Sequence, residues 1–287
     1  MHAWHLRTRT LTLDKPRILG IVNVTPDSFS DGGRFFSGEA AVEHGLRLVE
    51  GGADVLDIGG ESTRPQGAIP VDVEEELGRV LPVVRRLHER VPEVPISVDT
   101  VKSEVAAAVL HEGAEVINDV SAFRLDPAGA GVCARAGAGV ILMHSRGAVA
   151  DMATYQHASY GADVAGEVLG ELCQSVRLAE EAGVERSRIA LDPGVGFAKR
   201  SEHSLAVLGA IPRFAALGYP VVVGASRKRF IGELTAVPNP AERVEGTIGA
   251  NVMALALGAR IFRVHDVRAA RRALDVAWAI LQSGGEE

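Results

Sequence analysis

The sequence predicts an α/β protein built as a single closed (β/α)₈ barrel, and three observations lead to this fold class. Eight short apolar runs, of the kind that form strands buried on both faces, recur along the chain. Segments of helical character lie between them, which is the alternation that parallel strands require. The chain has 287 residues, and a typical barrel of this type has roughly 250. Together these observations predict the TIM barrel architecture.

The eight predicted strands are the apolar runs themselves. In chain order they are residues 18–22, 55–58, 96–98, 116–117, 140–143, 189–191, 221–223 and 261–264. The predicted helices are residues 39–50, 73–90, 101–111, 166–182, 241–257 and 267–281. The helix at 73–90 begins with acidic residues and ends in basic ones, as the helix dipole favours. The helix at 241–257 is the most apolar, and its Gly246, Gly249 and Ala250 would permit close packing.

An open doubly wound sheet is the alternative arrangement for such an alternation. That fold usually carries a Gly-rich nucleotide-binding fingerprint directly after its first strand. Here the first apolar run is followed by Asn23-Val24-Thr25-Pro26-Asp27, which lacks the fingerprint. The count of eight runs also suits a closed barrel better than an open sheet.

We expect one domain over residues 1–287, with a folded core at about 17–282, because no Pro/Ser-rich linker divides the chain. Hydrophobic residues make up 47% of the sequence, which is enough for a large core. The net charge of −7 argues against proteins that wrap nucleic acid or bind anionic membranes. A local cluster of Arg and Lys could still bind a small anionic substrate.

The hydropathy pattern and the two cysteines are those expected of an intracellular protein. The first ten residues have no long apolar run, and no apolar stretch is long enough to span a bilayer, so we expect the cytoplasm. Cys133 and Cys173 lie in segments of helical character. We interpret both as small buried apolar residues and expect neither a disulfide scaffold nor a thiolate metal site.

Most of the apolar runs end in polar side chains. These are Asn23, Asp57, Asp99, Asn118, Asp119, His144, Asp192, the Ser226-Arg227-Lys228 segment, Arg263 and His265. Taken singly, each has a structural explanation, since Asp and Asn at strand ends often cap helices or form turns. We interpret Asp57 as structural and His144 as supporting a site rather than reacting. In a barrel, however, these strand ends meet at one mouth, so the whole set indicates a binding site.

The residue types in this set suit a planar, nitrogen-rich heterocycle next to an anion. A carboxylate can accept two parallel hydrogen bonds from a ring N–H and an exocyclic amine. Arg263, His265 and Asn23 can surround an anion or help to hold a metal-bound phosphate. The Asn23 carbonyl is a hard oxygen ligand that suits Mg²⁺. The sequence has no His and Cys cluster at zinc spacing, so we do not expect zinc.

Seven short motifs occur in a fixed order along the chain. They are residues 18–33 (ILGIVNVTPDSFSDGG), 57–65 (DIGGESTRP), 97–100 (SVDT), 117–121 (INDVS), 192–197 (DPGVGF), 226–228 (SRK) and 263–267 (RVHDV). The ordered series resembles the motifs of the dihydropteroate synthase family, from about residue 18 to the last helix. This resemblance implies a TIM barrel and an alkyl transferase of folate biosynthesis. The family condenses 6-hydroxymethyl-7,8-dihydropterin pyrophosphate with p-aminobenzoate to give 7,8-dihydropteroate and pyrophosphate.

The resemblance also implies a role for each matching residue on the pterin side. The pterin ring would be held by Asp99, Asn118, Asp192 and Lys228. Arg263 would stack on that ring and, with His265 and Asn23, would bind the pyrophosphate and Mg²⁺. We expect the carbon–oxygen bond to break first, so that Mg²⁺, Arg263 and His265 neutralise the leaving group. Asp99 would stabilise the resulting cation, which makes Asp99, Lys228, Arg263 and His265 the catalytic candidates.

The p-aminobenzoate side is implied in the same way. Phe197 and Lys228 would form its pocket, where sulfonamide drugs bind in this family, and Met143 is a further candidate for contact with substrate. The loop with Thr63, Arg64 and Pro65, together with the loop at 25–36, would close over the site and exclude water. Arg229 stands where some family members have Ser. Its side chain or its backbone N–H could bind the p-aminobenzoate carboxylate, or it could be a solvated helix residue.

One further departure from the family pattern and two alternative functions remain open. The loop after Pro65 has Gln66-Gly67-Ala68 and is one residue longer than the usual family pattern. A methyltetrahydrofolate-dependent methyltransferase domain would share the pterin-binding Asp and Asn, and a non-catalytic pterin-binding homologue would share the fold. The family is typically dimeric, so we expect a homodimer with the apolar helices 241–257 and 267–281 as interface candidates. Core burial explains those apolar faces nearly as well.

Overall fold

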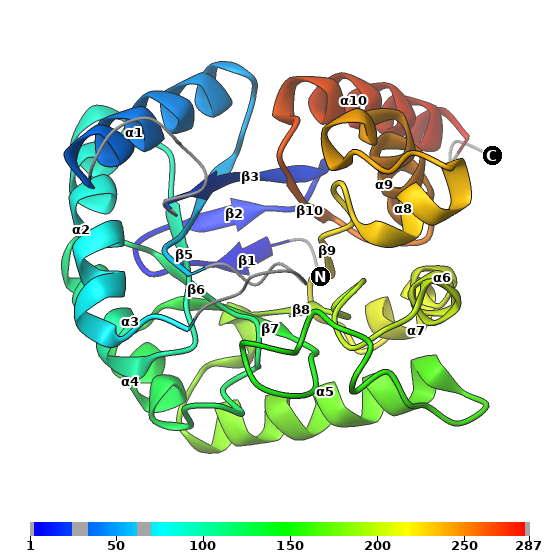
Figure 1. The fold of residues 1–287 in the computed structure, drawn as a ribbon, viewed down its shortest axis with the longest axis horizontal. Helices are drawn as coiled ribbons and strands as arrows, with labels where there is room; N and C mark the ends of the chain where they lie inside the picture. Colours follow the sequence, from blue (N-terminus) through cyan, green and yellow to red (C-terminus); the bar gives the residue numbers. More distant parts are fainter. Residues whose placement is uncertain (1–2, 25–33, 62–69, 285–287) are drawn as a thin grey trace.

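The computed structural model describes residues 3–24, 34–61 and 70–284 and forms a parallel barrel surrounded by helices (Figure 1). The eight barrel strands are β3 (Arg17–Asn23), β4 (Val55–Gly59), β5 (Ile96–Asp99), β6 (Val116–Asp119), β7 (Gly139–Met143), β8 (Ile189–Asp192), β9 (Val222–Val223) and β10 (Ile261–Val264). All eight coincide with predicted apolar runs to within two residues at either end. The predicted fold class, a single (β/α)₈ TIM barrel, is therefore confirmed.

Strand order and register explain how the barrel closes and where its mouth lies. The order is β8-β7-β6-β5-β4-β3-β10-β9, with every neighbouring pair parallel. The wall closes between β8 and β9 through one parallel bridge, Leu191 with Val221. At the carboxyl end, Asn23 pairs with Gly59 and Gly59 pairs with Asp99. Asp99 in turn pairs with Asn118, so polar strand ends line up along one rim.

Helices cover the outside of the barrel. They are α1 (Arg34–Glu50), α2 (Val73–Arg90), α3 (Ser103–His111), α4 (Ala128–Ala136), α5 (Val164–Glu181), α6 (Ser201–Gly209), α7 (Ile211–Ala215), α8 (Arg229–Thr235), α9 (Val244–Ala256) and α10 (Val267–Ser283). Short 3₁₀ turns are η2 (Arg186–Arg188) and η3 (Pro240–Glu242). The predicted start of α2 is confirmed, since Asp72 accepts a hydrogen bond from Glu75 N at 2.8 Å and three glutamates occupy the first turn.

Several helical details differ from the sequence prediction. Residues 34–36, which we expected in a loop, belong to the first turn of α1. The predicted helix 241–257 is divided into η3 and α9, because Asn239 caps a separate turn at Ala241. A side chain at Gly246 would overlap Ile231, so close packing is confirmed there, whereas a side chain at Gly249 would meet nothing.

The amino-terminal end of the barrel is closed by a hairpin that the sequence did not predict. Strands β1 (Ala3–His5) and β2 (Thr10–Thr12) pair antiparallel. Trp4 is fully buried among apolar side chains from seven of the barrel strands, and its indole N–H donates to the Arg188 carbonyl at 2.7 Å. The hairpin therefore extends the folded part of the chain beyond the core predicted from about residue 17. The hairpin fills the end of the barrel opposite the polar rim and so leaves one mouth for a site.

Cysteine placement and helix character agree largely with expectation. Cys133 is buried in α4, while Cys173 in α5 is only half-buried, so the expected burial holds for the first residue alone. Both are free thiols.

No helix within residues 3–24, 34–61 and 70–284 combines the length and the apolar character needed to cross a membrane.

Candidate active site

Arg263 on β10 lies at the centre of the mouth, between two carboxylates from other strands. Its Nε donates to Asp57 Oδ2 at 2.6 Å and its Nη2 donates to Asp99 Oδ2 at 2.8 Å. Burial works against the charge on Arg263, but the two carboxylates outweigh it and raise the pKa of Arg263 above its ordinary value. The guanidinium is therefore a fixed cation held at the mouth by β4 and β5.

Asp57 is the centre of this network and has no exposed surface. It accepts hydrogen bonds from Ser97 Oγ at 2.6 Å, from Asn118 Nδ2 at 3.2 Å and from Arg263 Nε. The sequence predicts a structural role for Asp57, acting on neighbouring backbone. Its partners are instead side chains of the candidate site. Because the Asn118 amide nitrogen is committed to Asp57, its carbonyl oxygen is left to accept from a ligand.

Two carboxylates at the mouth titrate close to neutral pH. Burial raises the pKa of Asp99 to about 7, against the opposing charge of Arg263. Burial also raises the pKa of Asp192 to about 6, although Asp192 Oδ1 accepts a hydrogen bond from Gly194 N at 2.7 Å. A ligand that donates two parallel hydrogen bonds would stabilise the anionic form of such a carboxylate, and an amino-heterocycle is a ligand of this kind.

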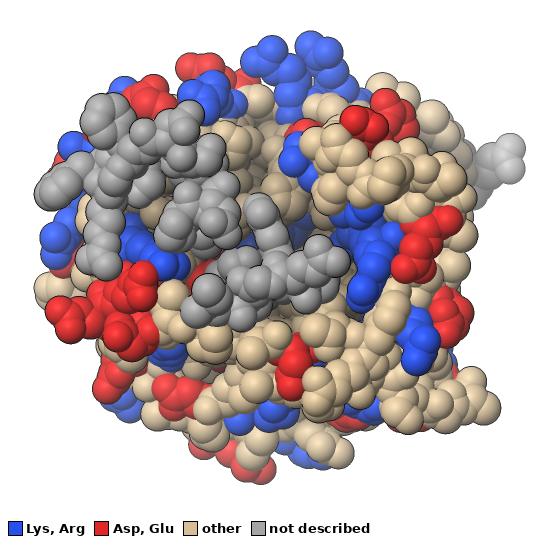
Figure 2. Space-filling view, viewed as in Figure 1, with Lys and Arg blue, Asp and Glu red and all other residues tan. Residues whose placement is uncertain are grey.

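Lys228 and Phe197 form the opposite side of the mouth. The Lys228 ammonium lies 3.9 Å from the centroid of the Phe197 ring. Burial lowers the pKa of Lys228 to about 8, and Arg263 adds to this effect. A side chain at Gly196 would press on Lys228, so glycine lets the two loops approach. Figure 2 shows Lys and Arg atoms gathered between the centre of this face and α8, in keeping with an anionic ligand.

Gly224 lies between the pterin-side residues predicted on β8 and β10. A Cβ placed at Gly224 would lie 3.6 Å from Asp192 Oδ2 and 3.9 Å from Arg263 Cβ. Asp192 and Arg263 therefore face the same small space. Together with the contacts of Asp99, Asn118 and Lys228, this brings all five predicted ring-binding residues to one mouth.

His265 and the Ser226-Arg227-Lys228 segment are joined by side-chain contacts. Ser226 Oγ lies 3.0 Å from His265 Nδ1 and accepts from His265 N at 3.2 Å. Arg227 has φ +58° and forms a two-pronged ion pair with Asp266 at 2.7 and 3.0 Å. These contacts tie the loop that carries Lys228 to the strand that carries Arg263.

Two further predicted residues take their positions from the strands. Asn23 ends β3 and is half-buried beside Gly59 on β4, which fits an accessible oxygen ligand at the rim. Met143 ends β7 and packs in a small apolar cluster with Phe197, Val120 and Met152. Met143 therefore lies on the Phe197 side of the mouth, and its contact with substrate stays a prediction.

Arg229 points to the outer rim and not to the network around Arg263. Its guanidinium lies 3.6 Å from the centroid of the Tyr155 ring and 4.0 Å from Glu233. The Tyr155 hydroxyl in turn donates to Glu233 at 3.0 Å. The predicted substrate residues Thr63, Arg64 and Pro65, the residues 66–68 and most of the loop at 25–36 lie outside the described residues.

Sequence reasoning missed one half-buried lysine, Lys102, and one buried lysine, Lys199, beside the predicted residues. Lys102 donates to Glu61 at 2.8 Å and also to Glu76, and Glu61 accepts from Val71 N at 3.0 Å. Lys199, two positions after Phe197, has only 1% of its surface exposed. Lysine is among the residues least often buried, so neither could have been found from composition or periodicity. The only signal is proximity to a motif.

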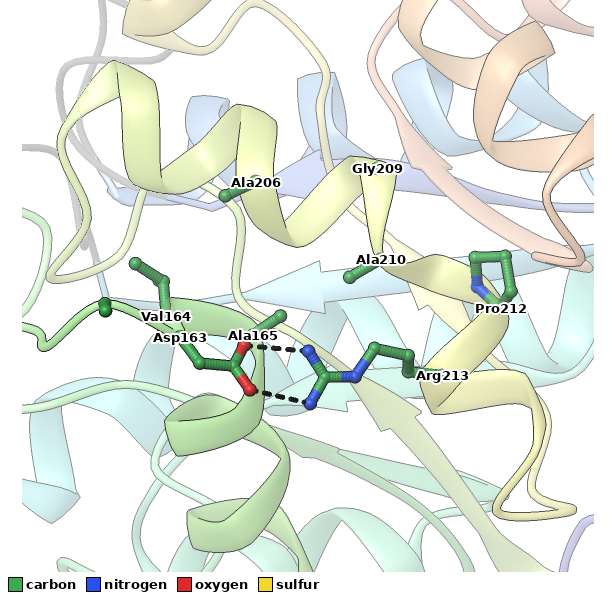
Figure 3. A pocket seen from close by; sticks show the side chains of 9 residues that line it. Asp163, Val164, Ala165, Ala206, Gly209, Ala210, Pro212 and Arg213 are labelled. Carbon is green, nitrogen blue, oxygen red and sulfur yellow. Dashed lines mark hydrogen bonds and ion pairs between the residues drawn. The ribbon is translucent and has the colours of Figure 1, made fainter.

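The described residues include a surface pocket that does not belong to this mouth. It has a volume of about 420 Å³ and lies between the start of α5 and the helices α6 and α7 (Figure 3). Its wall is mostly alanine and glycine, and its charged groups are Asp163 and Arg213, paired at 2.7 and 2.9 Å. Arg213 lowers the pKa of Asp163 to about 2, as in an ordinary ion pair. Nothing in this pocket suggests chemistry.

Comparison with known proteins agrees with the geometry of the mouth. The family described as pterin binding enzyme matches residues 19–265. A dihydropteroate synthase from Bacillus subtilis is 43% identical over 272 residues, covering 95% of this chain and 91% of the relative. The dihydropteroate synthase of Escherichia coli is 42% identical over 274 residues, covering 96% and 95%.

Solved structures give the same result in three dimensions. A Xanthomonas albilineans dihydropteroate synthase with 4-aminobenzoic acid has a TM-score of 0.90 and 48% identity, covering 98% of both chains. A structure of dihydropteroate synthase from that organism in complex with 7,8-dihydropteroate has a TM-score of 0.87 and 46% identity, covering 98% of this chain and 99% of the other.

Proposed function

The chain belongs to the dihydropteroate synthase family of pterin-binding enzymes, and on this premise we propose how its site residues act. It condenses 6-hydroxymethyl-7,8-dihydropterin pyrophosphate with p-aminobenzoate, and the products are 7,8-dihydropteroate and pyrophosphate. The proposed residue roles rest on one observation. Arg263 lies between Asp57 and Asp99, and the same mouth contains Asp192 and Lys228. The synthases similar to this chain leave the methyltransferase and the non-catalytic alternatives without support.

The pterin ring is bound by Asp99, Asn118, Asp192 and Lys228. Asp192 accepts from the N–H and exocyclic amine edge of the ring, while the Asn118 carbonyl and the Lys228 ammonium complete its polar edge. Asp192 sits in a rigid strand end, so its contribution is orientation. The two carboxylates, with pKa values of about 6 and about 7, become fully anionic when these donors approach.

The reaction breaks the bond between the pterin methylene carbon and the pyrophosphate oxygen, and the electron pair leaves with pyrophosphate. Arg263 and His265 stabilise the charge that develops on the leaving group. The positive charge left on the methylene spreads into the pterin ring, where anionic Asp99 stabilises it. The amine of p-aminobenzoate then supplies the electron pair of the new carbon–nitrogen bond and releases a proton to solvent. No described residue has to act as a strong base, because the aniline nitrogen is already nucleophilic.

Mg²⁺ fits this site as an ion that accompanies pyrophosphate. The described residues contain no group of three His, Cys, Asp or Glu that could hold a metal by themselves. Asn23 offers one oxygen at the rim, and Mg²⁺ usually keeps several waters and binds through few protein ligands and substrate phosphates. When bound, Mg²⁺ would neutralise the leaving group as a Lewis acid. We propose Asn23 as its protein ligand.

The p-aminobenzoate pocket is proposed at Phe197 and Lys228, with Met143 behind the Phe197 ring. The Phe197 face offers a surface for an aromatic ring, and the adjacent ammonium lies at 3.9 Å from its centroid. Arg229 remains a candidate for the carboxylate through its side chain or its backbone N–H, although its side chain rests on Tyr155. Sulfonamides, which share the aniline group, are proposed to compete for this pocket.

A homodimer is proposed through α9 and α10, which lie side by side (Figure 1). Exposed apolar side chains on these helices are Met253 at 60%, Val276 at 62%, Ile280 at 65% and Leu281 at 39% exposure. Scattered surface apolar residues are ordinary, but four on two adjacent helices form a candidate interface. Sedimentation velocity of the parent and of Ile280→Glu tests this, since only the variant should sediment as a monomer.

The expected cytoplasmic location stays a prediction, which cell fractionation tests.

The activity itself is tested by a coupled assay for pyrophosphate. Pyrophosphate release should require the dihydropterin pyrophosphate, p-aminobenzoate and Mg²⁺ together. Release without p-aminobenzoate would instead indicate hydrolysis. Pterin binding by calorimetry with no release under any condition would support a binding protein.

A further inference from the structure

Lys199 is a buried cation whose contacts are all internal and which the mechanism above does not use. It lies in the loop that connects β8 to α6, two residues after Phe197. Its ammonium lies 2.8 Å from His144 Nδ1 and donates to the carbonyl oxygens of Gly194 and Phe197, both at 3.1 Å. An ammonium has three donors, so all three N–H groups are used.

These contacts fix the tautomer of His144. Because the Glu171 carboxylate can only accept, the ring proton lies on Nε2 and Nδ1 accepts from Lys199, whose pKa burial lowers to about 7. Nε2 is 2.9 Å from Glu171 Oε2 on α5, and Arg146 also donates to Glu171. Burial lowers the pKa of His144 to about 4, which agrees with a neutral ring. A continuous chain of hydrogen bonds thus runs from α5 to the loop.

The loop needs such support because its backbone is strained. Gly194 and Gly196 have φ of +68° and +78°, and Ala198, which has a Cβ, has φ of +47°. An L-residue in this region costs free energy unless the surroundings hold it there. Besides Lys199, Ala198 N donates to Met152 O at 2.6 Å. The two carbonyls held by Lys199 belong to residues on either side of Gly196.

The position of this loop decides where the Phe197 ring lies. Phe197 contacts the Lys228 ammonium and packs with Met143 and Met152, so a shift of the loop would move one wall of the mouth. The backbone of the strand end that carries Asp192 is held by the β7–β8 pairing at Met143 and by the closing bridge at Leu191, and its carboxylate accepts from Gly194 N at the start of the loop. The Phe197 end of the loop can therefore change while the backbone of the pterin-binding strand ends stays in place.

We propose that Lys199, held by His144 and Glu171, is a positioning residue that sets the Phe197 loop and so determines the affinity of the site for the aromatic amine. This inference rests on the proposed p-aminobenzoate pocket at Phe197. It assigns Lys199 no contact with substrate. Its effect must therefore appear in the second substrate and not in the pterin.

Lys199→Met keeps most of the side-chain volume and removes the three donors. The KM for p-aminobenzoate should rise about tenfold or more, since the Phe197 loop loses its hydrogen bonds to the Lys199 side chain. The Kd for the dihydropterin, measured by calorimetry, should stay within about threefold, which is under 1 kcal/mol. The matched control is Glu202→Gln, an exposed change at the start of α6, which should alter neither constant.

A pair of substitutions at His144 tests the same chain if Lys199→Met does not fold. His144→Gln keeps an acceptor for the ammonium and a donor for Glu171, whereas His144→Leu keeps neither. The KM for p-aminobenzoate should stay near the parent value for His144→Gln and rise for His144→Leu. Equal KM values in the two variants would overturn the proposal.

Two results with folded Lys199→Met would also overturn it: an unchanged KM for p-aminobenzoate, or an equal loss of pterin affinity. Phe197→Ala, measured alongside, separates the premise from the inference. If Phe197→Ala leaves the KM unchanged, the assignment of the pocket has failed. If Phe197→Ala raises the KM and Lys199→Met does not, the role of Lys199 has failed.

Discussion

Asp57 and Arg263, 206 positions apart in the chain, form an ion pair at 2.6 Å in which the carboxylate is fully buried. The same carboxylate orients Asn118, and the same guanidinium reaches Asp99. One buried charge thus sets the positions of three groups assigned to the pterin and to the leaving pyrophosphate. The predictions that follow concern this network and the groups around it.

Asp57→Asn should lower both stability and activity. Removing one charge of a buried ion pair costs about 3 to 5 kcal/mol when the other charge is left unpaired. Because Asp99 still pairs with Arg263, we expect a smaller loss of about 1 to 3 kcal/mol from the disrupted hydrogen bonds. The free energy of unfolding in urea measures the loss, and kcat/KM should fall in parallel. Asp163→Asn breaks the exposed pair with Arg213 and should change neither quantity measurably. Equal stability of the two variants would contradict the account.

Arg263→Gln should weaken inhibition by pyrophosphate. The substitution keeps hydrogen-bonding capacity but removes the cation proposed to stabilise the leaving group. Loss of one preorganised group of this kind costs about 10² to 10³ in kcat. The inhibition constant for product pyrophosphate should rise as kcat falls. An unchanged inhibition constant would remove the anion-binding role of Arg263.

The pH dependence of kcat/KM should be bell-shaped. Asp192 and Asp99 accept hydrogen bonds from the pterin only when ionised, so activity rises as pH increases through about 6 to 7. Lys228 is needed as a cation, so activity falls above about 8. Lys228→Arg should move the alkaline limb to higher pH, because arginine keeps its charge. A flat profile between about pH 5 and 9 would contradict these roles.

The raised pKa of Asp192 also makes the free energy of unfolding depend on pH. The pKa of Asp192 is higher in the folded state than its ordinary value of 3.8, so the folded protein binds more protons between pH 3.8 and about 6. Stability contributed by Asp192 is therefore present at low pH and is lost as pH rises through this window. Asp192→Asn should flatten the change, as measured by urea unfolding at pH 4 and pH 7.

Gly194→Ala should destabilise the fold strongly. A Cβ at Gly194 would overlap the carbonyl oxygen of His144, and the φ of +68° adds strain for any residue with a side chain. Overpacking of this kind costs about 1 to 3 kcal/mol before the backbone strain is added. Gly170→Ala, in the middle of α5 with nothing within 4 Å, should instead stabilise by about 1 kcal/mol. Thermal or urea unfolding of both variants provides the comparison.

The barrel could be predicted from the sequence because buried parallel strands leave a strong local signal. Each strand is a short apolar run, and β9 is shorter than predicted by a single residue, Val221, which forms the closing bridge instead. The β1–β2 hairpin has strands of three residues, too short for a periodic pattern. The bounds of the short helices α4, α6, α7 and α8 are not predicted for a similar reason, since five to nine residues give little amphipathic signal.

The site was predictable where a polar residue ends an apolar run. Asp99, Asn118 and Asp192 are of this kind, and strand register carries them to one rim. The role of Asp57 could not be predicted, because its partners lie up to 206 positions away and only the closed barrel brings them together. Lys199 was missed because its partner His144 is 55 positions away and burial of a lysine leaves no pattern in the chain.

The central claim is that one mouth binds the pterin ring beside the group that takes up the pyrophosphate charge. A crystal structure of the protein soaked with dihydropterin pyrophosphate and Mg²⁺ tests it most directly. The account predicts the ring against Asp99, Asn118 and Asp192, with the phosphates at Arg263 and His265. A ring bound elsewhere, or phosphates that avoid Arg263, would contradict it.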